Sequence, residues 1–242
     1  MTKLSVNINK IATLRNARGG KIPDLFAIAR LCEEFGADGI TVHPRPDERH
    51  ITLKDTYKLS QLVQKEFNIE GYPDKRYLQI IKDLKPEQAT LVPDLPNVLT
   101  SDQGWDTHNN QDFLMDIISE IKSYGSRVSL FINPDIELIK KAAELGADRI
   151  ELYTGPYSEM YADNKEEAIK TFKKAAIYAK QCGLGINAGH DLNLLNLAWL
   201  IKNIPFLDEV SIGHALVSDA LYFGLENTIQ MYLYEIEKGT NN

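Results

Sequence analysis

The sequence predicts an α/β protein that folds as one (β/α)8 barrel, residues 1–242, and three observations favour this fold. Eight short apolar segments alternate with helical patterns along the chain. The segments are rich in Val and Ile and largely lack strict polar alternation, as parallel strands buried on both faces do. Polar residues gather where these segments end, and in a barrel all such ends surround one mouth. A doubly wound sheet is the alternative, because periodicity cannot show whether a sheet closes.

The predicted strands cover residues 4–8, 39–43, 67–71, 89–93, 127–132, 149–153, 184–189 and 209–214. The clearest predicted helix covers residues 110–124, where four apolar residues repeat at helical spacing and make one stripe. Residues 133–146 predict a helix with Asn133 as N-cap, Pro134 in its first turn and Gly146 after its end. Similar patterns predict helices at 164–182, 193–203 and 215–237.

Two segments of the chain resemble each other about half a barrel apart, EEFGADGITV at 33–42 and AELGADRIEL at 143–152. Both predict the end of a helix, a Gly-Ala-Asp turn and the start of a strand. One short match does not establish a duplication, because similar helix-to-strand turns need similar residues.

Composition restricts the class of protein and its partners. The formal net charge of −7 argues against general nucleic-acid or anionic-membrane binding. No apolar run has the length of a membrane span, and the first residues lack the apolar region of a signal peptide. The two cysteines, Cys32 and Cys182, are expected to be reduced thiols. We therefore expect a cytoplasmic protein that binds neither nucleic acid nor a membrane.

The residues at the predicted strand ends have the chemistry of an active site. Asn7, Asn9, Lys10, Arg15 and Arg18 follow or end the first strand, and His43, Arg45, Arg49 and His50 the second. The third strand ends in Glu70, the sixth in Glu151 and Thr154, the seventh in Asn187 and His190, and the eighth in His214. A single histidine at such a position is more often structural than catalytic. Because a closed barrel would bring several of them together with Glu70, the set favours acid–base chemistry.

Glu70 is the sharpest candidate. It ends a buried strand, where desolvation raises the pKa of a carboxyl and makes it a usable base. A salt bridge to Arg18 or Lys10 is the alternative for this residue, and Glu151 is more easily explained as a partner that orients a histidine. The arginines suit phosphate or carboxylate, although a solvated face explains Arg15 and Arg49 equally well.

Two loops add to this prediction. Gly213 comes just before a predicted helix, and free N–H groups at such a start can bind phosphate. The polar segment 94–110 is long for a loop between strand and helix and predicts a lid; a disordered insertion is the alternative.

Taken together, these motifs resemble the pyridoxine 5′-phosphate synthase family, and the resemblance runs from end to end. The segments that carry it are VNINKIATLRNARGG (6–20), DGITVHPRPDERHI (38–51), NIEGY (68–72), LVPD (91–94), VSLFI (128–132), IELYTG (150–155), INAGHDL (186–192) and IGHALV (212–217). The resemblance implies a (β/α)8 barrel that joins 1-deoxy-D-xylulose 5-phosphate to 3-amino-2-oxopropyl phosphate. The implied products are pyridoxine 5′-phosphate, phosphate and water, with no metal or organic cofactor. It also implies a homo-octamer built from dimers.

The resemblance carries residue roles with it. His43 and Glu70 match the family's proton acceptors, and His190 matches its proton donor. Positions that hold the amino-ketone phosphate are matched by Asn7, Arg18, Gly213 and His214, and Asp191 is carried over as a substrate-binding position. Positions that hold the deoxyxylulose phosphate are matched by Arg45, His50 and Thr100, and Asn9 and Lys10 are carried over as further substrate-binding positions.

Two departures from the family's pattern concern substrate binding. The family commonly has Asp-His where this chain has Asn9-Lys10, which replaces an acid and an imidazole by an amide and a fixed cation. The residue after His190 is usually Gly and here is Asp191. A backbone N–H contact survives that change unless φ is positive at this residue or the carboxylate repels phosphate.

Two other classes of protein stay open on the sequence alone. One is a metal-dependent isomerase or hydrolase with Glu70, Glu151, His190 and His214 as ligands, although no HxH or HExxH spacing supports it. The other is a catalytically silent protein that binds sugar phosphates, which the Asn9-Lys10 departure keeps open.

Overall fold

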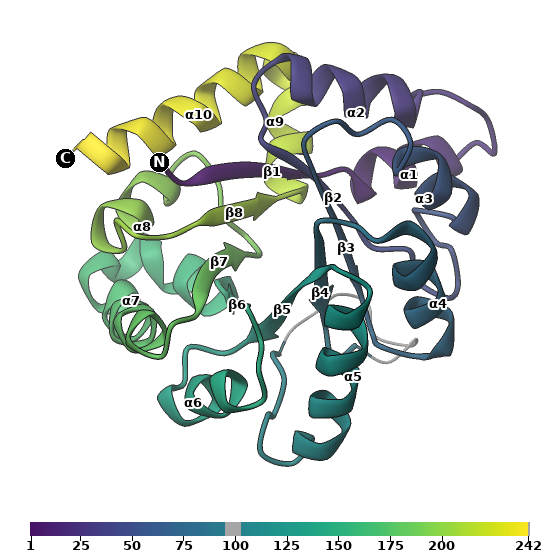
Figure 1. The fold of residues 1–242 in the computed structure, drawn as a ribbon. Coiled ribbons are helices and arrows are strands. Elements are labelled where there is room, and N and C mark those ends of the chain that lie inside the picture. The colour runs from purple at the N-terminus through teal and green to yellow at the C-terminus, as the bar shows by residue number, and fades with distance from the viewer. Residues whose placement is uncertain (95–102, 242) are drawn as a thin grey trace.

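In the computed structural model, which describes residues 1–94 and 103–241, eight parallel strands form a closed barrel with helices around it (Figure 1). The strands are β1 (Lys3–Asn7), β2 (Gly39–Val42), β3 (Glu66–Gly71), β4 (Gln88–Leu91), β5 (Arg127–Ile132), β6 (Arg149–Tyr153), β7 (Gly185–Gly189) and β8 (Glu209–Ile212). Each strand pairs with its neighbours in chain order, and β1 pairs with β8, for example Val6 with Ile212. All eight predicted strands are confirmed, and closure excludes the doubly wound alternative.

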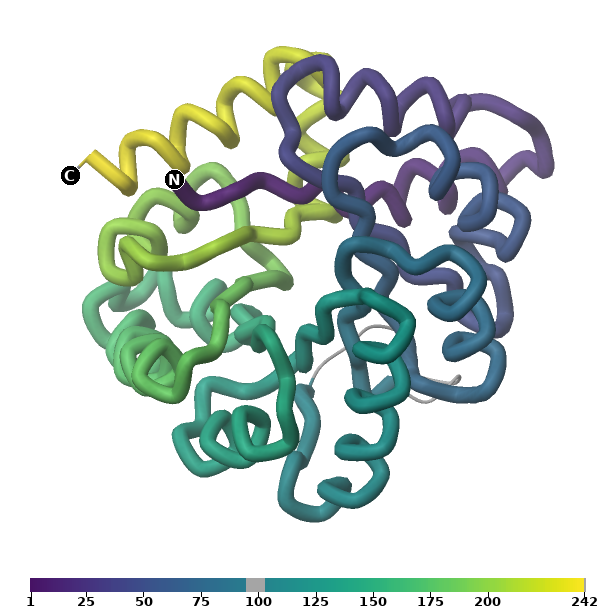
Figure 2. Tube along the Cα trace, viewed as in Figure 1, coloured from purple at the N-terminus to yellow at the C-terminus, as the bar shows by residue number. Residues whose placement is uncertain are grey.

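The helices that surround the strands are α1 (Asn9–Asn16), α2 (Leu25–Glu34), α3 (Leu53–Leu59), α4 (Lys75–Leu84), α5 (Gln111–Ser123), α6 (Ile136–Glu144), α7 (Gly155–Gln181), α8 (Leu197–Asn203), α9 (His214–Phe223) and α10 (Leu225–Asn241). Figure 2 shows the chain running once around the barrel, so that α10 lies outside the seam between its first and last strands. None of the helices in the described ranges is long and apolar enough to cross a membrane.

Four predicted helices have other boundaries in the structure, and one of them, predicted at 193–203, begins only at Leu197 as α8. Asp135 caps α6, not Asn133, because the Asp135 side chain accepts from the N–H groups of Glu137 and Leu138. Helix α7 begins at Gly155, and a non-helical residue, Asn164, bends it at the residue where the prediction began. The single helix predicted at 215–237 is two helices, because Gly224 between them has a φ of 77°.

The two faces of the strands bury different chemistry. The outer faces carry apolar residues that pack under the helices, such as Leu4, Val6, Ile40 and Ile69. The residues between them face the barrel interior, and this interior is polar instead of aliphatic. Several of its side chains hydrogen-bond to one another: the hydroxyls of Ser5 and Thr41 are 2.7 Å apart, Asn68 donates to Thr41 (3.2 Å) and Thr90 donates to Asn68 (2.9 Å). The predicted burial of both strand faces is therefore confirmed. The expectation that the strands largely lack polar alternation was wrong, because apolar outer residues alternate with polar residues that face the closed interior.

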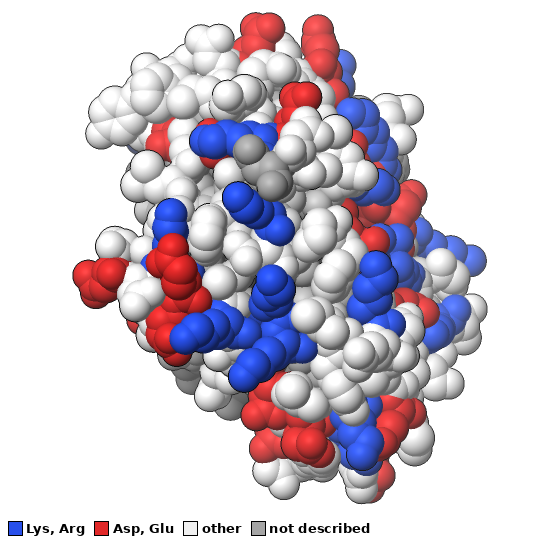
Figure 3. All heavy atoms as spheres, turned by 90° about the vertical axis from the view of Figure 1, so that its left-hand side faces the viewer, with Lys and Arg blue, Asp and Glu red and all other residues white. Residues whose placement is uncertain are grey.

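The surface outside the barrel carries charges of both signs. On the face seen in Figure 3, Lys and Arg side chains are interspersed with Asp and Glu. This pattern is typical of the solvated surface of a globular protein.

Candidate active site

The candidate catalytic pair is formed by residues from two neighbouring strands, with Asn7 from a third strand beside it. His43 directly follows β2 and Glu70 lies in β3, so parallel pairing brings both to the mouth. The His43 Nδ1 atom lies 4.0 Å from Glu70 Oε2, and both side chains are nearly buried. Asn7, at the end of β1, donates its amide N–H to the same Glu70 oxygen at 3.3 Å. The structure therefore confirms that His43, Glu70 and Asn7 lie together.

Two asparagine side chains fix the backbone at His43. Asn7 Oδ1 accepts a hydrogen bond from the Asn9 N–H at 3.0 Å, and Asn9 Oδ1 accepts one from the His43 N–H at 2.9 Å. The Asn9 oxygen is thus already engaged with the chain, and its amide N–H groups are what it can offer to a ligand.

Burial makes both members of the pair neutral near pH 7. Burial, with the nearby charges of Asp94 and Glu209, raises the pKa of Glu70 to about 8, although the Asn7 hydrogen bond acts in the opposite direction. Burial likewise lowers the pKa of His43 well below its ordinary value, assisted by Arg45, His50 and His190. A neutral imidazole is a competent proton acceptor, and Glu70 becomes one as the pH approaches 8. The predicted direction of the Glu70 shift is confirmed, and no salt bridge to Arg18 or Lys10 accounts for this residue within the described ranges.

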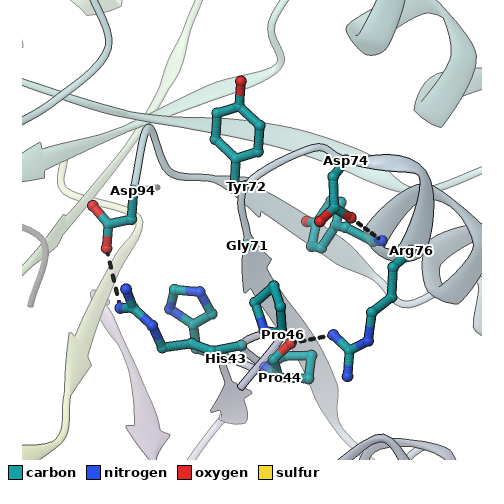
Figure 4. A pocket seen from close by; sticks show the side chains of 10 residues that line it. His43, Pro44, Pro46, Gly71, Tyr72, Asp74, Arg76 and Asp94 are labelled. Carbon is teal, nitrogen blue, oxygen red and sulfur yellow. Dashed lines mark hydrogen bonds and ion pairs between the residues drawn. The ribbon is translucent and has the colours of Figure 1, made fainter. Parts of the chain in front are cut away.

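Arg45 lies in the wall of the mouth. Its guanidinium is 3.4 Å from Asp94, which follows β4, and both side chains are about 5% exposed. In Figure 4 the dashed line from Asp94 marks this ion pair, near the His43 ring. The two residues help to line a cavity of about 20 Å³, which has room for one water molecule. An arginine at this position can exchange its carboxylate partner for the phosphate of a substrate.

His50 stands next to His43, with the two ring centroids 6.2 Å apart. Its Nδ1 accepts a hydrogen bond from the Ile51 N–H at 2.9 Å, so in the neutral ring the proton is on Nε2. Burial, followed by the charges of Arg45 and Lys10, lowers the pKa of His50 to about 4. His50 is therefore a neutral hydrogen-bond donor at neutral pH, and the exposed Lys10 lies near enough to influence it.

His190 enters the site from the end of β7, and aromatic residues flank it. Its ring centroid lies 5.1 Å from that of Phe131 and 5.4 Å from that of Tyr153. Burial lowers the pKa of His190, against the opposite influence of Asp191 and Asp94. His190 follows β7 and His43 follows β2, so closure of the parallel barrel places both at the same mouth.

The backbone is left-handed at both His190 (φ 79°) and Asp191 (φ 57°). The positive φ at Asp191 is the condition under which replacing the family's Gly by Asp affects a backbone N–H contact. Asp tolerates this conformation better than most residues do, at some cost relative to Gly. The exposed Asp191 carboxylate also adds a negative charge beside the position matched to the amino-ketone phosphate.

The remaining predicted phosphate positions lie around β8 and β1. Gly213 precedes α9 and packs against Asn7, where an added Cβ would come 3.1 Å from the Asn7 Cβ. His214 is the first residue of α9 and is exposed. Arg18 lies in the exposed turn after α1, and no hydrogen bond or ion pair joins it to the other site residues within the described ranges. Thr100 lies outside the described residues.

Arg15 and Arg49 have different environments. Arg15 makes two hydrogen bonds to Asp55, at 2.8 and 2.7 Å, and its side chain is only 12% exposed. The prediction of a solvated face was therefore wrong for Arg15, because a sequence cannot show which acid a long side chain will reach. Arg49 pairs with Asp47 in an exposed turn, as predicted.

Glu151 lies below the mouth and is almost fully buried. Its Oε2 has no hydrogen-bond partner, and an added Cβ at Gly189 would overlap its Oε1. Burial, together with Glu70, raises the pKa of Glu151 well above its ordinary value. No hydrogen bond joins it to a histidine ring among the described residues, so its predicted orienting role does not act through such a bond. Among residues 1–94 and 103–241, no group of three or more His, Cys, Asp or Glu is placed to hold a metal ion.

Sequence reasoning missed Asp94, Phe131 and Tyr153. Asp94 was visible only as an acid after the fourth strand, with nothing to indicate Arg45 as its partner. The two aromatic residues read as core. Of the predicted lid, residues 103–110 are described, and Trp105 in them is buried, with its ring N–H donating to the Leu91 carbonyl at 3.0 Å.

The sequence of this chain is similar to a known protein family over nearly its whole length. The family described as "Pyridoxal phosphate biosynthesis protein PdxJ" matches residues 4–238. A pyridoxine 5′-phosphate synthase from Cytophaga hutchinsonii is 60% identical over 238 residues, which are 98% of this chain and 100% of that protein. One from Bacteroides fragilis is 59% identical over 232 residues, covering 96% and 98% of the two chains.

Solved structures with low sequence identity share the fold. Phosphoribosylanthranilate isomerase from Thermotoga maritima superposes with a TM-score of 0.61 at 13% identity, covering 98% of this chain and 99% of that one. Thiamine phosphate pyrophosphorylase from Pyrococcus furiosus gives 0.64 at 14% identity, covering 98% and 96%. Both likenesses concern the barrel alone.

Proposed function

The chain belongs to the PdxJ family and is an enzyme that forms pyridoxine 5′-phosphate, and we propose that it does so with the residues at the mouth of its barrel. Its substrates are small phosphorylated molecules. We propose 1-deoxy-D-xylulose 5-phosphate and 3-amino-2-oxopropyl phosphate, with pyridoxine 5′-phosphate, phosphate and water as products.

The observation that carries this proposal is the arrangement of His43 and Glu70. The two groups are 4.0 Å apart in a nearly buried site, and burial shifts their pKa values in opposite directions, toward neutral forms. Joining an amino-ketone to a keto-sugar requires imine formation, dehydrations, loss of phosphate and an aldol-type ring closure. Each of these steps moves protons near neutral pH, which groups with such pKa values can do.

We assign the proton transfers to three side chains. Neutral His43 and, as it ionises, Glu70 accept protons, and His190 donates them. Asn7 supports this assignment, because its hydrogen bond to Glu70 holds the carboxyl on the side that faces His43. We assign Glu151 an orienting role, because it is buried below the mouth and packs against Gly189, the residue before His190.

Two groups of residues hold the two phosphates. Around the start of α9, the amino-ketone phosphate meets Asn7, Arg18, Gly213 and His214. On the side of β2, the deoxyxylulose phosphate meets Arg45 and His50. Thr100, which lies outside the described residues, is proposed for the same phosphate, and Asn9, Lys10 and Asp191 are proposed as further substrate-binding residues. The Arg45–Asp94 pair supports this arrangement, because a buried arginine with a carboxylate partner is prepared to receive an anion.

Larger-scale properties complete the proposal. We propose a homo-octamer built from dimers, located in the cytoplasm, with no metal or organic cofactor and no nucleic-acid or membrane partner. The predicted lid at 94–110 stays a prediction, since residues 95–102 lie outside the described part of the chain.

The decisive experiment mixes the purified protein with both phosphorylated substrates and follows pyridoxine 5′-phosphate and inorganic phosphate. We expect both products, and we expect the same rate after exhaustive chelation. Binding of both substrates without product would instead favour a silent sugar-phosphate binding protein. Loss of activity on chelation, restored by a divalent metal, would contradict the assignment to His and Glu alone.

A further inference from the structure

The turn that carries His190 has an uncommon backbone. Four non-glycine residues of the described chain have a positive φ, and two of them, His190 and Asp191, are consecutive. Left-handed residues other than Gly persist only where surrounding contacts hold them, and they concentrate at functional sites.

Three side chains from neighbouring elements hold this turn. The Thr154 hydroxyl oxygen lies 2.6 Å from the Gly189 carbonyl oxygen and 2.5 Å from that of His190, and its single hydrogen is shared between these two acceptors. The carbonyl of Asp191 accepts from the Ser158 hydroxyl at 2.9 Å and from the Asn196 amide at 3.2 Å. The carbonyls of three successive residues of the turn are therefore fixed from α7 and from the segment before α8.

The Thr154 hydroxyl is used for this turn in place of a more common role. Thr154 is the N-cap residue of α7, where a threonine oxygen ordinarily accepts a hydrogen bond from the first turn of its helix. Here the side chain makes no such bond, although the residue is completely buried. The Thr154 backbone N–H also donates to the Gly189 carbonyl at 2.9 Å, so the residue meets the end of β7 twice.

The ring of His190 is held as closely as its backbone. It packs against Phe131 and Tyr153, whose ring centroids lie 5.1 and 5.4 Å from its own and 5.4 Å from each other. Because both aromatic rings belong to strands, a change of φ at residue 190 would move the imidazole away from its contacts with them.

We propose that Thr154 is a positioning residue for His190: its hydroxyl fixes the left-handed turn that directs the imidazole into the mouth of the barrel. This inference rests on the proposed role of His190 as proton donor. Thr154 touches neither substrate, and it acts on turnover only through the placement of the His190 ring.

The test begins with Thr154→Val, which keeps the shape of the side chain and removes the hydroxyl. We expect kcat to fall by about 10- to 100-fold, because a catalytic group displaced by about 1 Å loses rate on that scale. The KM values for both substrates should change much less. Thr154→Ser keeps the hydroxyl and should restore kcat to within about threefold of the wild-type value.

Thr228→Val is the matched control for lost stability. Thr228 is also completely buried and donates its hydroxyl to a backbone carbonyl, that of Gly224 at 2.8 Å, but it lies in α10. It should lower Tm about as much as Thr154→Val and leave kcat unchanged. Equal losses of kcat in the two variants would overturn the proposal, as would a Thr154→Val enzyme with the wild-type kcat.

A double-mutant cycle with His190→Gln separates this inference from the function it rests on. If Thr154 acts through His190, Thr154→Val should cause little further loss of kcat in the His190→Gln background. A further loss as large as in the wild-type background would overturn the inference and leave the role of His190 intact. A His190→Gln enzyme with the wild-type kcat would instead overturn the proton-donor role itself, and the inference with it.

Discussion

The protonation of Glu70 depends on residues that are far from it in the sequence. Burial at the end of β3 is the largest cause of its raised pKa, and the next is Asp94, which follows β4. His43 lies 4.0 Å from Glu70, and Tyr77, Glu151 and Glu209 interact with it electrostatically from other elements. Glu70 is therefore mostly protonated at pH 7 because of contacts that its neighbours in the sequence do not provide.

Replacing this carboxyl tests its role directly. Glu70→Gln should abolish measurable turnover, because the amide keeps the shape and the neutral charge of the protonated acid but cannot accept a proton. Binding of each phosphorylated substrate, measured by calorimetry, should stay close to that of the wild type. Normal turnover in this variant would remove Glu70 from the mechanism.

The pH dependence of turnover should report Glu70 and its neighbour Asp94. Since a base must be ionised, kcat/KM should rise with pH through an apparent pKa near 8. Removing the negative charge in Asp94→Asn makes ionisation of Glu70 easier, so the rise should move to lower pH. The pH profile of kcat/KM measures this shift.

Asp74→Asn is the control for that profile. Asp74 lines the same cavity, but its carboxylate accepts from the Tyr77 N–H at the start of α4 and is not among the groups that raise the pKa of Glu70. Its profile should match that of the wild type. An unmoved profile in Asp94→Asn would show that Asp94 only holds Arg45.

At the scale of the elements, one turn design recurs where helices lead into strands. Asp38, before β2, accepts from the Leu4 N–H at 3.0 Å, and Asp148, before β6, accepts from the Val128 N–H at 2.9 Å. In both turns the glycine two residues earlier has a positive φ, 111° at Gly36 and 86° at Gly146. The similar sequences of 33–42 and 143–152 therefore agree with the interpretation that similar helix-to-strand turns need similar residues.

A second contact between elements joins α1 to the start of α3. Asp55 closes the capping box of α3 with Thr52 and also receives the Arg15 guanidinium. Burial opposes ionisation of Asp55, but the Arg15 and Thr52 hydrogen bonds outweigh it and lower its pKa. Because the folded pKa is lowered, the stabilisation is present above the pKa of an unfolded Asp, about 3.9, and is lost as the pH falls through the folded pKa.

Asp55→Asn should therefore reduce the free energy of unfolding by about 2 kcal/mol at pH 7, because it leaves the Arg15 guanidinium without its ionised partner. The difference from the wild type should shrink below about pH 4, where the wild-type pair also loses its charge. Chemical unfolding at the two pH values measures this. Asp47→Asn, in an exposed pair that solvent screens, should have a much smaller effect.

At the scale of the whole molecule, the barrel interior couples folding to pH. Burial, with Glu70, raises the pKa of Glu151, and burial, with Glu66, raises that of Glu209. The folded protein thus keeps protons that an unfolded glutamate releases above about pH 4.3. Between that pH and the folded pKa, stability should fall as the pH rises, by at most about 1.4 kcal/mol per pH unit for each group.

Glu151→Gln should reveal this coupling. Glutamine carries no charge in either state, so the variant should gain stability relative to the wild type as the pH rises from about 4 to 8. Thermal unfolding over this range measures the gain. Exposed Glu159→Gln removes the same charge from the surface and should follow the wild-type curve. Parallel curves for Glu151→Gln and the wild type would contradict a proton held in the folded state.

The sequence by itself determined the order of strands and helices and which residues stand at strand ends. These features follow from local patterns, in which apolar runs, caps and strand-end residues are neighbours along the chain. Local patterns also placed His43, Glu70 and Gly213 at the strand ends where they are found. They misplaced the start of α7 and the break at Gly224, where packing and backbone conformation decide.

Only the tertiary structure decided which of these residues act on one another. Closure of the barrel pairs Arg45 with Asp94 and Arg15 with Asp55, sets Phe131 against His190, and directs the Thr154 hydroxyl to the turn after β7. Each pair joins separate elements, so no spacing in the sequence encodes it. The pKa values of the site depend on the same closure, because burial and distant charges exist only once the strands have met.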